Sequence, residues 1–122
     1  MGKKILVVDD EPFIVQMVVS RLTASGYESI SAADGDEALK KARSENPDLI
    51  ILDVMLPKMD GFQVCAVLKQ DERYQHIPII LFTAKGGDKA RQVGLEECGA
   101  DGYLTKPFEA QKLLAKISEL LK

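Results

Sequence analysis

The chain has 122 residues, of which 46% are apolar and 29% are charged, and its formal net charge is −3. This length suits one domain with one core, and the composition is that of a globular protein rather than a disordered one. The small negative charge offers no basic field for direct nucleic-acid binding, no apolar run could span a membrane, and no signal peptide is visible, so we expect a cytoplasmic protein.

Strand-like and helix-like segments alternate from the N-terminus. Residues 5–8 form a continuous apolar run, which is typical of a strand buried on both faces. A helix is expected to begin at Pro12 and to stop at Gly26. Its expected apolar face consists of Phe13, Ile14, Met17, Val18 and Leu22. Residues 27–31 are more mixed, as expected of an edge strand, and Asp34 or Asp36 can cap a second helix that stops before Asn46 and Pro47.

The same alternation continues in the second half of the chain. Residues 49–52 and 79–82 are two further apolar runs, and a helix with Cys65 on it lies between them. We read Cys65 and Cys98 as small core residues, because no other metal or disulfide ligands accompany them. A fourth helix is expected around residues 88–97, although Gly94 disfavours it by about 1 kcal/mol relative to Ala. A short strand at residues 103–105 precedes an amphipathic last helix that uses Leu113, Leu114, Ile117, Leu120 and Leu121.

Five strands that alternate with five helices predict an α/β fold in one domain, residues 1–122. Right-handed crossovers then give a parallel sheet with helices on both faces. The three apolar runs favour the centre of the sheet and the two weaker strands its edges. This arrangement is the flavodoxin-like doubly wound sheet of strand order 2-1-3-4-5, whose topological switch point lies between the first and third strands.

Chemically active side chains stand where these strands end. They are Asp9 and Asp10 after the first strand, Asp53 after the third, Thr83 after the fourth and Lys106 after the fifth. Taken one at a time, each has an ordinary structural role as a helix cap, a turn residue or a solvated charge. Ligands of open parallel sheets bind beyond the carboxyl ends of the strands, so their joint placement favours a site for a hard divalent cation and a phosphoryl group.

Four segments carry a resemblance to a known family. They are ILVVDDEP at residues 5–12, DLIILDVMLP at 48–57 with MDG at 59–61, PIILFTA at 78–84, and GADGYLTKPF at 99–108. Together and in this order they resemble the two-component response-regulator receiver domain, and the likeness runs from Lys3 to Lys122. The chain is most similar to single-domain receivers of the chemotaxis-regulator kind. Receivers have the strand order 2-1-3-4-5, so that order is not independent of the resemblance.

The resemblance implies a phosphorylatable switch. Asp53 would be the phosphoacceptor and would receive its phosphoryl group from a histidine kinase or a phosphotransfer protein. Mg²⁺ or Mn²⁺ would be held by Asp10, Asp53 and the backbone carbonyl of Met55, and Asp9 would assist directly or through water. Three ionised aspartates and a protonated lysine carry a charge of −2, which one divalent cation would cancel, so metal binding and phosphoryl approach would be favoured together.

The remaining site residues would transmit the signal. Thr83 and Lys106 would contact the phosphoryl oxygens, and Tyr103 would reorient on activation. The face formed by the fourth helix, fifth strand and fifth helix would then change and dock an output protein or effector domain. The resemblance implies a monomer or a weak phosphorylation-dependent dimer, with no direct contact to nucleic acid or membrane. It also implies no enzyme activity beyond the domain's own phosphorylation and dephosphorylation. A chain that ends with its last helix favours a stand-alone receiver over a piece of a larger regulator.

Three other functions fit the residues less well. A phosphatase that works through an aspartyl-phosphate needs a general acid two residues after the nucleophile, where Met55 stands. A flavodoxin-type cofactor binder needs a phosphate cradle after the first strand, but residues 9–12 are acidic and would repel phosphate. A binding module that is never phosphorylated would not need the complete set of site residues.

Overall fold

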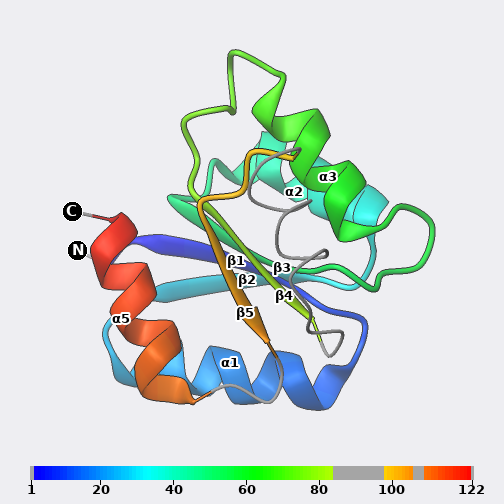
Figure 1. Ribbon diagram of the computed structural model, residues 1–122. Coiled ribbons are helices and arrows are strands. Elements are labelled where there is room, and N and C mark those ends of the chain that lie inside the picture. Colours follow the sequence, from blue (N-terminus) through cyan, green and yellow to red (C-terminus); the bar gives the residue numbers. More distant parts are fainter. Residues whose placement is uncertain (1, 84–97, 106–108, 122) are drawn as a thin grey trace.

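The chain forms a five-stranded parallel sheet of order β2-β1-β3-β4-β5 with helices on both faces (Figure 1). Its structure, a computed structural model, describes residues 2–83, 98–105 and 109–121. The strands are β1 (Lys4–Val8), β2 (Glu28–Ala32), β3 (Leu49–Asp53), β4 (Ile79–Thr83) and β5 (Gly102–Thr105). The helices of the described ranges are α1 (Pro12–Ala24), α2 (Gly35–Glu45), α3 (Gly61–Lys69) and α5 (Ala110–Leu120). The predicted fold class and strand order are confirmed, whereas the expected fourth helix lies outside the described residues.

The three apolar runs occupy the centre of the sheet, as their composition predicted. β1, β3 and β4 each have a hydrogen-bonded neighbour on both sides, and all residues from Leu49 to Asp53 are buried. The edge strand β2 is more exposed along most of its length. Because helices cover both faces of the sheet, the central strands have no solvent-exposed face, and their sequences are continuous rather than alternating apolar runs.

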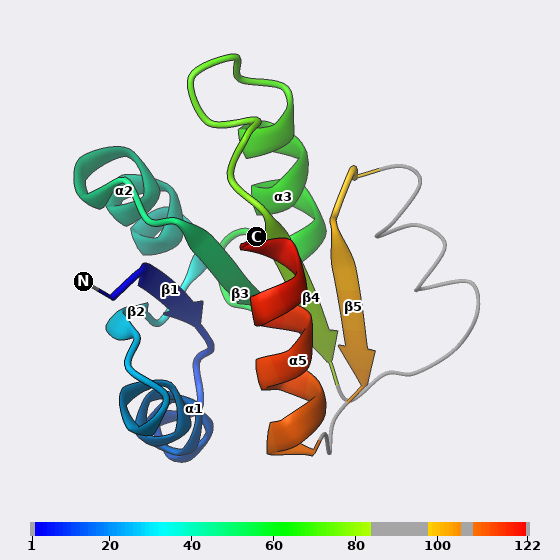
Figure 2. The same cartoon turned by 90° about the vertical axis from the view of Figure 1, so that its left-hand side faces the viewer.

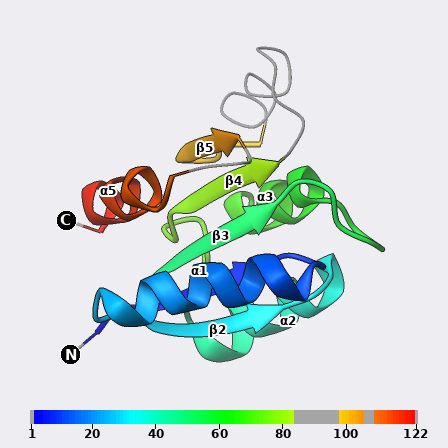
Figure 3. The ribbon, with the colours of Figure 1, turned by 90° about the horizontal axis from the view of Figure 1, so that it is seen from below.

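Two cores form because successive residues of a strand point to opposite faces. Leu6, Ile50 and Leu81 belong to the cluster under α2 and α3, and Ile51 and Phe82 to the cluster under α1 and α5. Figure 2 shows α2 and α3 above the sheet, and Figure 3 shows α1 and α5 together on the opposite side. Each fully buried aliphatic side chain contributes about 1.5–3 kcal/mol relative to an exposed one.

Polar caps fix where two of the helices begin. Asp34, one of the two candidates for this role, accepts a hydrogen bond from the backbone N–H of Glu37 at 2.8 Å and so caps α2. Asp60 and Gln63 form a reciprocal capping box at the start of α3. The chain leaves α2 through Asn46, whose φ of 48° is left-handed. These caps settle the lengths of the loops that follow β2 and β3.

The expected apolar face of α1 was wrong for two of its members. Val18 and Leu22 are buried, but Phe13 is 73% exposed and Met17 is 37% exposed. At 3.6 residues per turn the five apolar positions cover about 180° of the helix, which is wider than the strip that packs on the sheet. α1 therefore presents an apolar strip, Phe13 and Met17, to its surroundings. None of the helices in the described ranges has the length and apolar character needed to cross a bilayer.

Candidate functional site

Three carboxylates meet at the carboxyl ends of β1 and β3. Asp9, Asp10 and Asp53 each offer an oxygen atom, and these atoms lie within 4.8 Å of one another. Asp9 and Asp53 are buried, with 1% and 3% of their surface exposed, whereas Asp10 is exposed. Because β1 and β3 are hydrogen-bonded neighbours, their ends coincide, and the predicted meeting of these residues is confirmed. We call these three residues the acidic cluster.

Backbone hydrogen bonds position the first half of the acidic cluster. The N–H of Asp9 donates to the carbonyl of Ala32 at 3.1 Å, which ties the end of β1 to the end of β2. One carboxylate oxygen of Asp9 accepts from the N–H of Glu11 at 2.9 Å. Pro12 then begins α1, where its missing N–H is no loss. The chain turns away from the sheet directly after the two aspartates and leaves the side chain of Asp10 at the surface.

The β3–α3 connection positions Asp53. An oxygen of its carboxylate accepts from the N–H of Met55 at 3.1 Å, and the N–H of Gly61 donates to the carbonyl of Val54 at 2.9 Å. A Cβ on Gly61 would stand 2.3 Å from the carbonyl oxygen of Asp53 and 2.8 Å from the Cα of Val54. Both of these are backbone atoms that cannot move aside cheaply. Only glycine therefore lets α3 begin against the end of β3.

The loop between Asp53 and Gly61 is tightly bent. Lys58 adopts a left-handed φ of 69°, and its ammonium lies 3.6 Å from the carboxylate of Asp34. The N–H of Met59 donates to the carbonyl of Pro57 at 2.8 Å. Met55 is 52% exposed beside Asp53. The loop carries the predicted carbonyl ligand, Met55, and is fixed at both ends by backbone contacts.

The other predicted site residues come from the far half of the sheet. Thr83 is the last residue of β4, and its register partner Thr105 ends β5, so both stand at the same edge as the acidic cluster. Tyr103 is half-buried against the core under α2 and α3, and burial raises the pKa of its phenol. Lys106 lies outside the described residues. The structure thus brings the aspartates together and places Thr83 and Tyr103 on the neighbouring strands.

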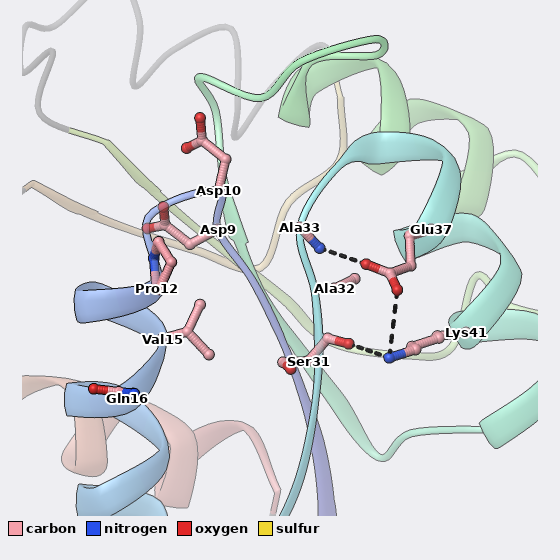
Figure 4. A pocket seen from close by; sticks show the side chains of 10 residues that line it. All are labelled: Asp9, Asp10, Pro12, Val15, Gln16, Ser31, Ala32, Ala33, Glu37 and Lys41. Carbon is pink, nitrogen blue, oxygen red and sulfur yellow. Dashed lines mark hydrogen bonds and ion pairs between the residues drawn. The ribbon is translucent and has the colours of Figure 1, made fainter.

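A groove of about 300 Å³ opens beside Asp9 and Asp10, between α1 and the start of α2 (Figure 4). Its far wall carries Glu37, which accepts from the N–H of Ala33 at 2.7 Å and lies 3.7 Å from the ammonium of Lys41. Lys41 also donates to the carbonyl of Ser31. We did not identify this network from the sequence. The spacing of Glu37 and Lys41, four residues apart on a predicted helix, is the signal that could have found it.

The donor set of the acidic cluster fits a hard divalent cation. Mg²⁺ prefers oxygen ligands at about 2.0–2.1 Å in octahedral geometry, so ligand atoms on opposite sides of the ion stand roughly 4.2 Å apart. The ligand atoms of the acidic cluster lie within 4.8 Å of one another, which is compatible with that separation. These carboxylates could therefore share one cation, through direct contacts or through water. This fits the expected ligands, in which Asp10 and Asp53 bind directly and Asp9 assists.

Comparisons with known proteins identify the family. The profile of the response regulator receiver domain matches residues 5–118, and the chain belongs to this family. It is 51% identical to the alkaline phosphatase synthesis transcriptional regulatory protein PhoP of Bacillus subtilis, over all of this chain and 50% of that protein. The chain spans about half the length of the curated relatives that it matches.

Solved structures agree with this assignment. The chemotaxis protein CheY4 of Vibrio cholerae superposes with a TM-score of 0.91 at 38% identity, covering 99% of this chain and 100% of that one. The receiver domain of the sensor histidine kinase PA1611 from Pseudomonas aeruginosa superposes with a TM-score of 0.90 at 30% identity, covering 99% and 98% of the two chains. In that receiver a magnesium ion is coordinated in the active-site cleft. The chain is thus a response-regulator receiver domain of a two-component system, with the doubly wound fold of its neighbours.

Proposed function

We propose that Asp53 is the phosphoacceptor of this receiver domain and takes a phosphoryl group from a histidine kinase or a phosphotransfer protein. The observation that carries the proposal is the acidic cluster at the topological switch point of a receiver fold. Asp53 is the member that ends the central strand β3, with Asp9 and Asp10 on one side and the end of β4 on the other. It is therefore the carboxylate that a phosphoryl group can reach while it contacts both halves of the sheet.

Asp10 and Asp53, with the carbonyl of Met55, hold Mg²⁺ or Mn²⁺ in this proposal, and Asp9 orients the site through water. When bound, the cation supplies positive charge that offsets the repulsion between the carboxylates and an incoming anionic phosphoryl group. The spread of the acidic cluster and the magnesium ion in the PA1611 receiver support this assignment.

The transfer leaves little covalent work for the protein beyond positioning. A carboxylate oxygen of Asp53 attacks the phosphorus of a phosphohistidine, a P–O bond forms, and the P–N bond breaks with its electron pair returning to the imidazole nitrogen. The N–H of Met55 donates to one oxygen of the Asp53 carboxylate, and this hydrogen bond orients the other oxygen for the attack. The chain acts on its own Asp53, so we infer a switch rather than an enzyme with a separate substrate.

In this proposal, residues on or just after β4 and β5 respond to the phosphoryl group. Thr83 donates its hydroxyl to a phosphoryl oxygen, the ammonium of Lys106 contacts another, and Tyr103 reorients as they move. Support comes from the position of Thr83 at the end of β4, one residue after Phe82, the register partner of Asp53. The added charge shifts an equilibrium between two conformations of the surface around β5 and α5. This surface controls an output protein or effector domain.

The phosphodonor protein docks over α1 in this account. Phe13 and Met17 form an exposed apolar strip that begins three residues after Asp10. A donor has to bring a phosphohistidine to Asp53, so part of its surface must pack beside the acidic cluster, and buried apolar area there supplies the affinity. The exposed charge of Arg21 on the same helix would contribute to partner choice more than to affinity.

Acetyl phosphate with Mg²⁺, followed by intact mass measurement, tests the proposal. The wild type should gain one phosphoryl mass that is lost on incubation at alkaline pH, and Asp53→Asn should gain none. Asp36→Asn, which changes an exposed carboxylate on α2, is the matched control and should label like the wild type. Stoichiometric labelling of Asp53→Asn, or no labelling of the wild type at any Mg²⁺ concentration, would overturn the assignment.

A further inference from the structure

Two buried thiols meet between α3 and the segment that leads into β5. Cys65 lies on α3 and Cys98 lies four residues before β5, and both belong to the core cluster under α2 and α3. The Sγ of Cys65 donates to the backbone carbonyl of Cys98 at 3.3 Å, across 33 residues of sequence. None of the roles proposed above uses either thiol.

We propose that Cys65 and Cys98 are a redox site that closes to a reversible disulfide when hydrogen peroxide reaches it. A disulfide requires two cysteines whose Cα atoms are about 4.4–6.8 Å apart, which restricts it to residues in direct packing contact. The hydrogen bond keeps the sulfur of Cys65 against the backbone of residue 98. The two residues also sit on separate elements, so their bond would join α3 to the approach of β5 rather than close a local turn.

The two thiols differ in burial. Cys65 is fully buried, and desolvation, together with the neighbouring Cys98 thiol, raises its pKa to about 12. Cys98 has 8% of its surface exposed. The thiolate is the nucleophile toward peroxide, so the less buried Cys98 reacts first and Cys65 acts as the resolving thiol.

The chemistry balances in two steps. The sulfur of Cys98 attacks one peroxide oxygen, the O–O bond breaks, and a sulfenic acid and one water are formed. The sulfur of Cys65 then gives up its proton and attacks the sulfenic sulfur, the S–O bond breaks, and the departing hydroxide takes a proton to become the second water. Two thiols and one hydrogen peroxide give one disulfide and two waters, and an added thiol reverses the reaction.

The bond would act on the switch. Gly99, Ala100 and Asp101 connect Cys98 to β5, which carries Tyr103. A covalent link to α3 would hold the start of β5 in place and so reduce the movement that phosphorylation is proposed to cause there. This second part rests on the proposed function, whereas formation of the disulfide does not.

Peroxide treatment of the folded protein, followed by alkylation and tryptic mapping without reductant, tests the first part. We expect one species lighter by two hydrogens, in which the peptide of residues 59–69 is linked to that of residues 92–112 and which dithiothreitol returns to the starting mass. Cys65→Ala should instead accumulate a dimedone-reactive sulfenic acid on Cys98. A dimedone adduct on wild-type Cys98 without the linked peptide, a link that forms only in urea, or no reaction would overturn the proposal.

Hydrogen exchange with beryllofluoride and Mg²⁺ tests the second part. Reduced protein should show protection changes in residues 98–105 on adding beryllofluoride, and oxidised protein should show changes at least twofold smaller. Equal changes in both forms would overturn the effect on the switch. If reduced protein shows no change anywhere, the proposed function fails while the disulfide result stands separately.

Discussion

The carboxylates at the two ends of the sheet have opposite electrostatic surroundings. At the amino end, Asp48 accepts from the N–H of Lys4 at 2.8 Å, beside the start of β3. Asp101 pairs with the ammonium of Lys69 at 2.8 Å and accepts from the N–H of Ile79 at the same distance. Lys69 also donates to the carbonyl of Ile77 at 2.7 Å. Asp48 and Asp101 therefore each accept a hydrogen bond from a backbone N–H at the start of a strand, and Asp101 also neutralises the charge of Lys69.

At the carboxyl end, three carboxylates are held within 4.8 Å of one another, and two of them are buried. Like charges at such distances repel, more strongly where water is excluded. The carboxylates at the amino end thus stabilise the fold, whereas those at the carboxyl end, where the phosphoryl group is proposed to bind, repel one another. In the proposed function, a bound cation relieves this repulsion, and its positive charge then lets an anionic phosphoryl group approach.

The largest expected effect comes from reducing the charge of the acidic cluster. Asp10→Asn should slow phosphorylation by acetyl phosphate on the order of 100-fold, because the site loses a ligand charge and its positioning of the cation. Rates are measured by intact mass at several Mg²⁺ concentrations. A rate equal to that of the wild type at low Mg²⁺ would show that the metal binds elsewhere.

Gly61→Ala should disturb the acidic cluster by displacing the backbone beside Asp53. The added Cβ would stand 2.3 Å from the carbonyl oxygen of Asp53, so the start of α3 must shift. We expect a loss of about 1–3 kcal/mol in the free energy of unfolding and about a tenfold slower phosphorylation.

Gly26→Ala is the control, since its Cβ would meet no atom within 4 Å although its φ is 87°. It should cost about 1 kcal/mol through backbone strain and leave the phosphorylation rate unchanged. Equal effects of the two variants on the rate would remove the role assigned to Gly61.

Lys69→Met should damage the amino end alone. It leaves Asp101 and the carbonyl of Ile77 without their ammonium donor, and we expect a loss of about 2 kcal/mol in the free energy of unfolding, limited because Asp101 remains 35% exposed. Urea unfolding followed by circular dichroism suits a chain without tryptophan. Lys40→Met, on the exposed face of α2, should change stability by less than about 0.5 kcal/mol. Loss of phosphorylation in folded Lys69→Met would break the division between the two ends.

Asp71→Asn should have the smallest effect. The side chain and backbone of Arg73 donate to Asp71 and lower its pKa from 3.8 to about 2. A carboxylate with a lowered pKa contributes stability above its unfolded pKa, and that contribution is lost as the pH falls from about 4 to 2. The wild type should therefore be slightly more stable to unfolding than Asp71→Asn at pH 7, and the difference should shrink as the pH falls and vanish below about pH 2. A difference that does not change with pH would contradict this cause.

The sequence predicted the elements that depend on local patterns. The apolar run 5–8 leads directly into Asp9, so both the buried strand and the position of its terminal carboxylates follow from one segment. The same reasoning placed Asp53 at the end of β3 and Cys65 and Cys98 in the core. It failed for Phe13 and Met17, because periodicity gives the apolar side of a helix but not how much of that side the sheet covers.

Contacts between distant residues could not be predicted in the same way. Lys69 and Asp101 are an ordinary surface lysine and turn aspartate in the sequence, and only the packing of α3 beside the segment that leads into β5 brings them together. The hydrogen bond between Cys65 and Cys98 has the same origin. Lys58 has a left-handed φ although lysine does not favour that region, so the residue type does not predict it.

Unfolding by urea with and without Mg²⁺ tests the central claim most directly, on the wild type and Asp10→Asn. Without metal, Asp10→Asn should be more stable than the wild type by about 1 kcal/mol, because one of three clustered charges is gone. With saturating Mg²⁺ the order should reverse, since the cation stabilises the folded wild type by mass action. If the wild type is the more stable protein in both conditions by the same margin, the carboxyl end does not hold opposed charges for a cation, and the account is wrong.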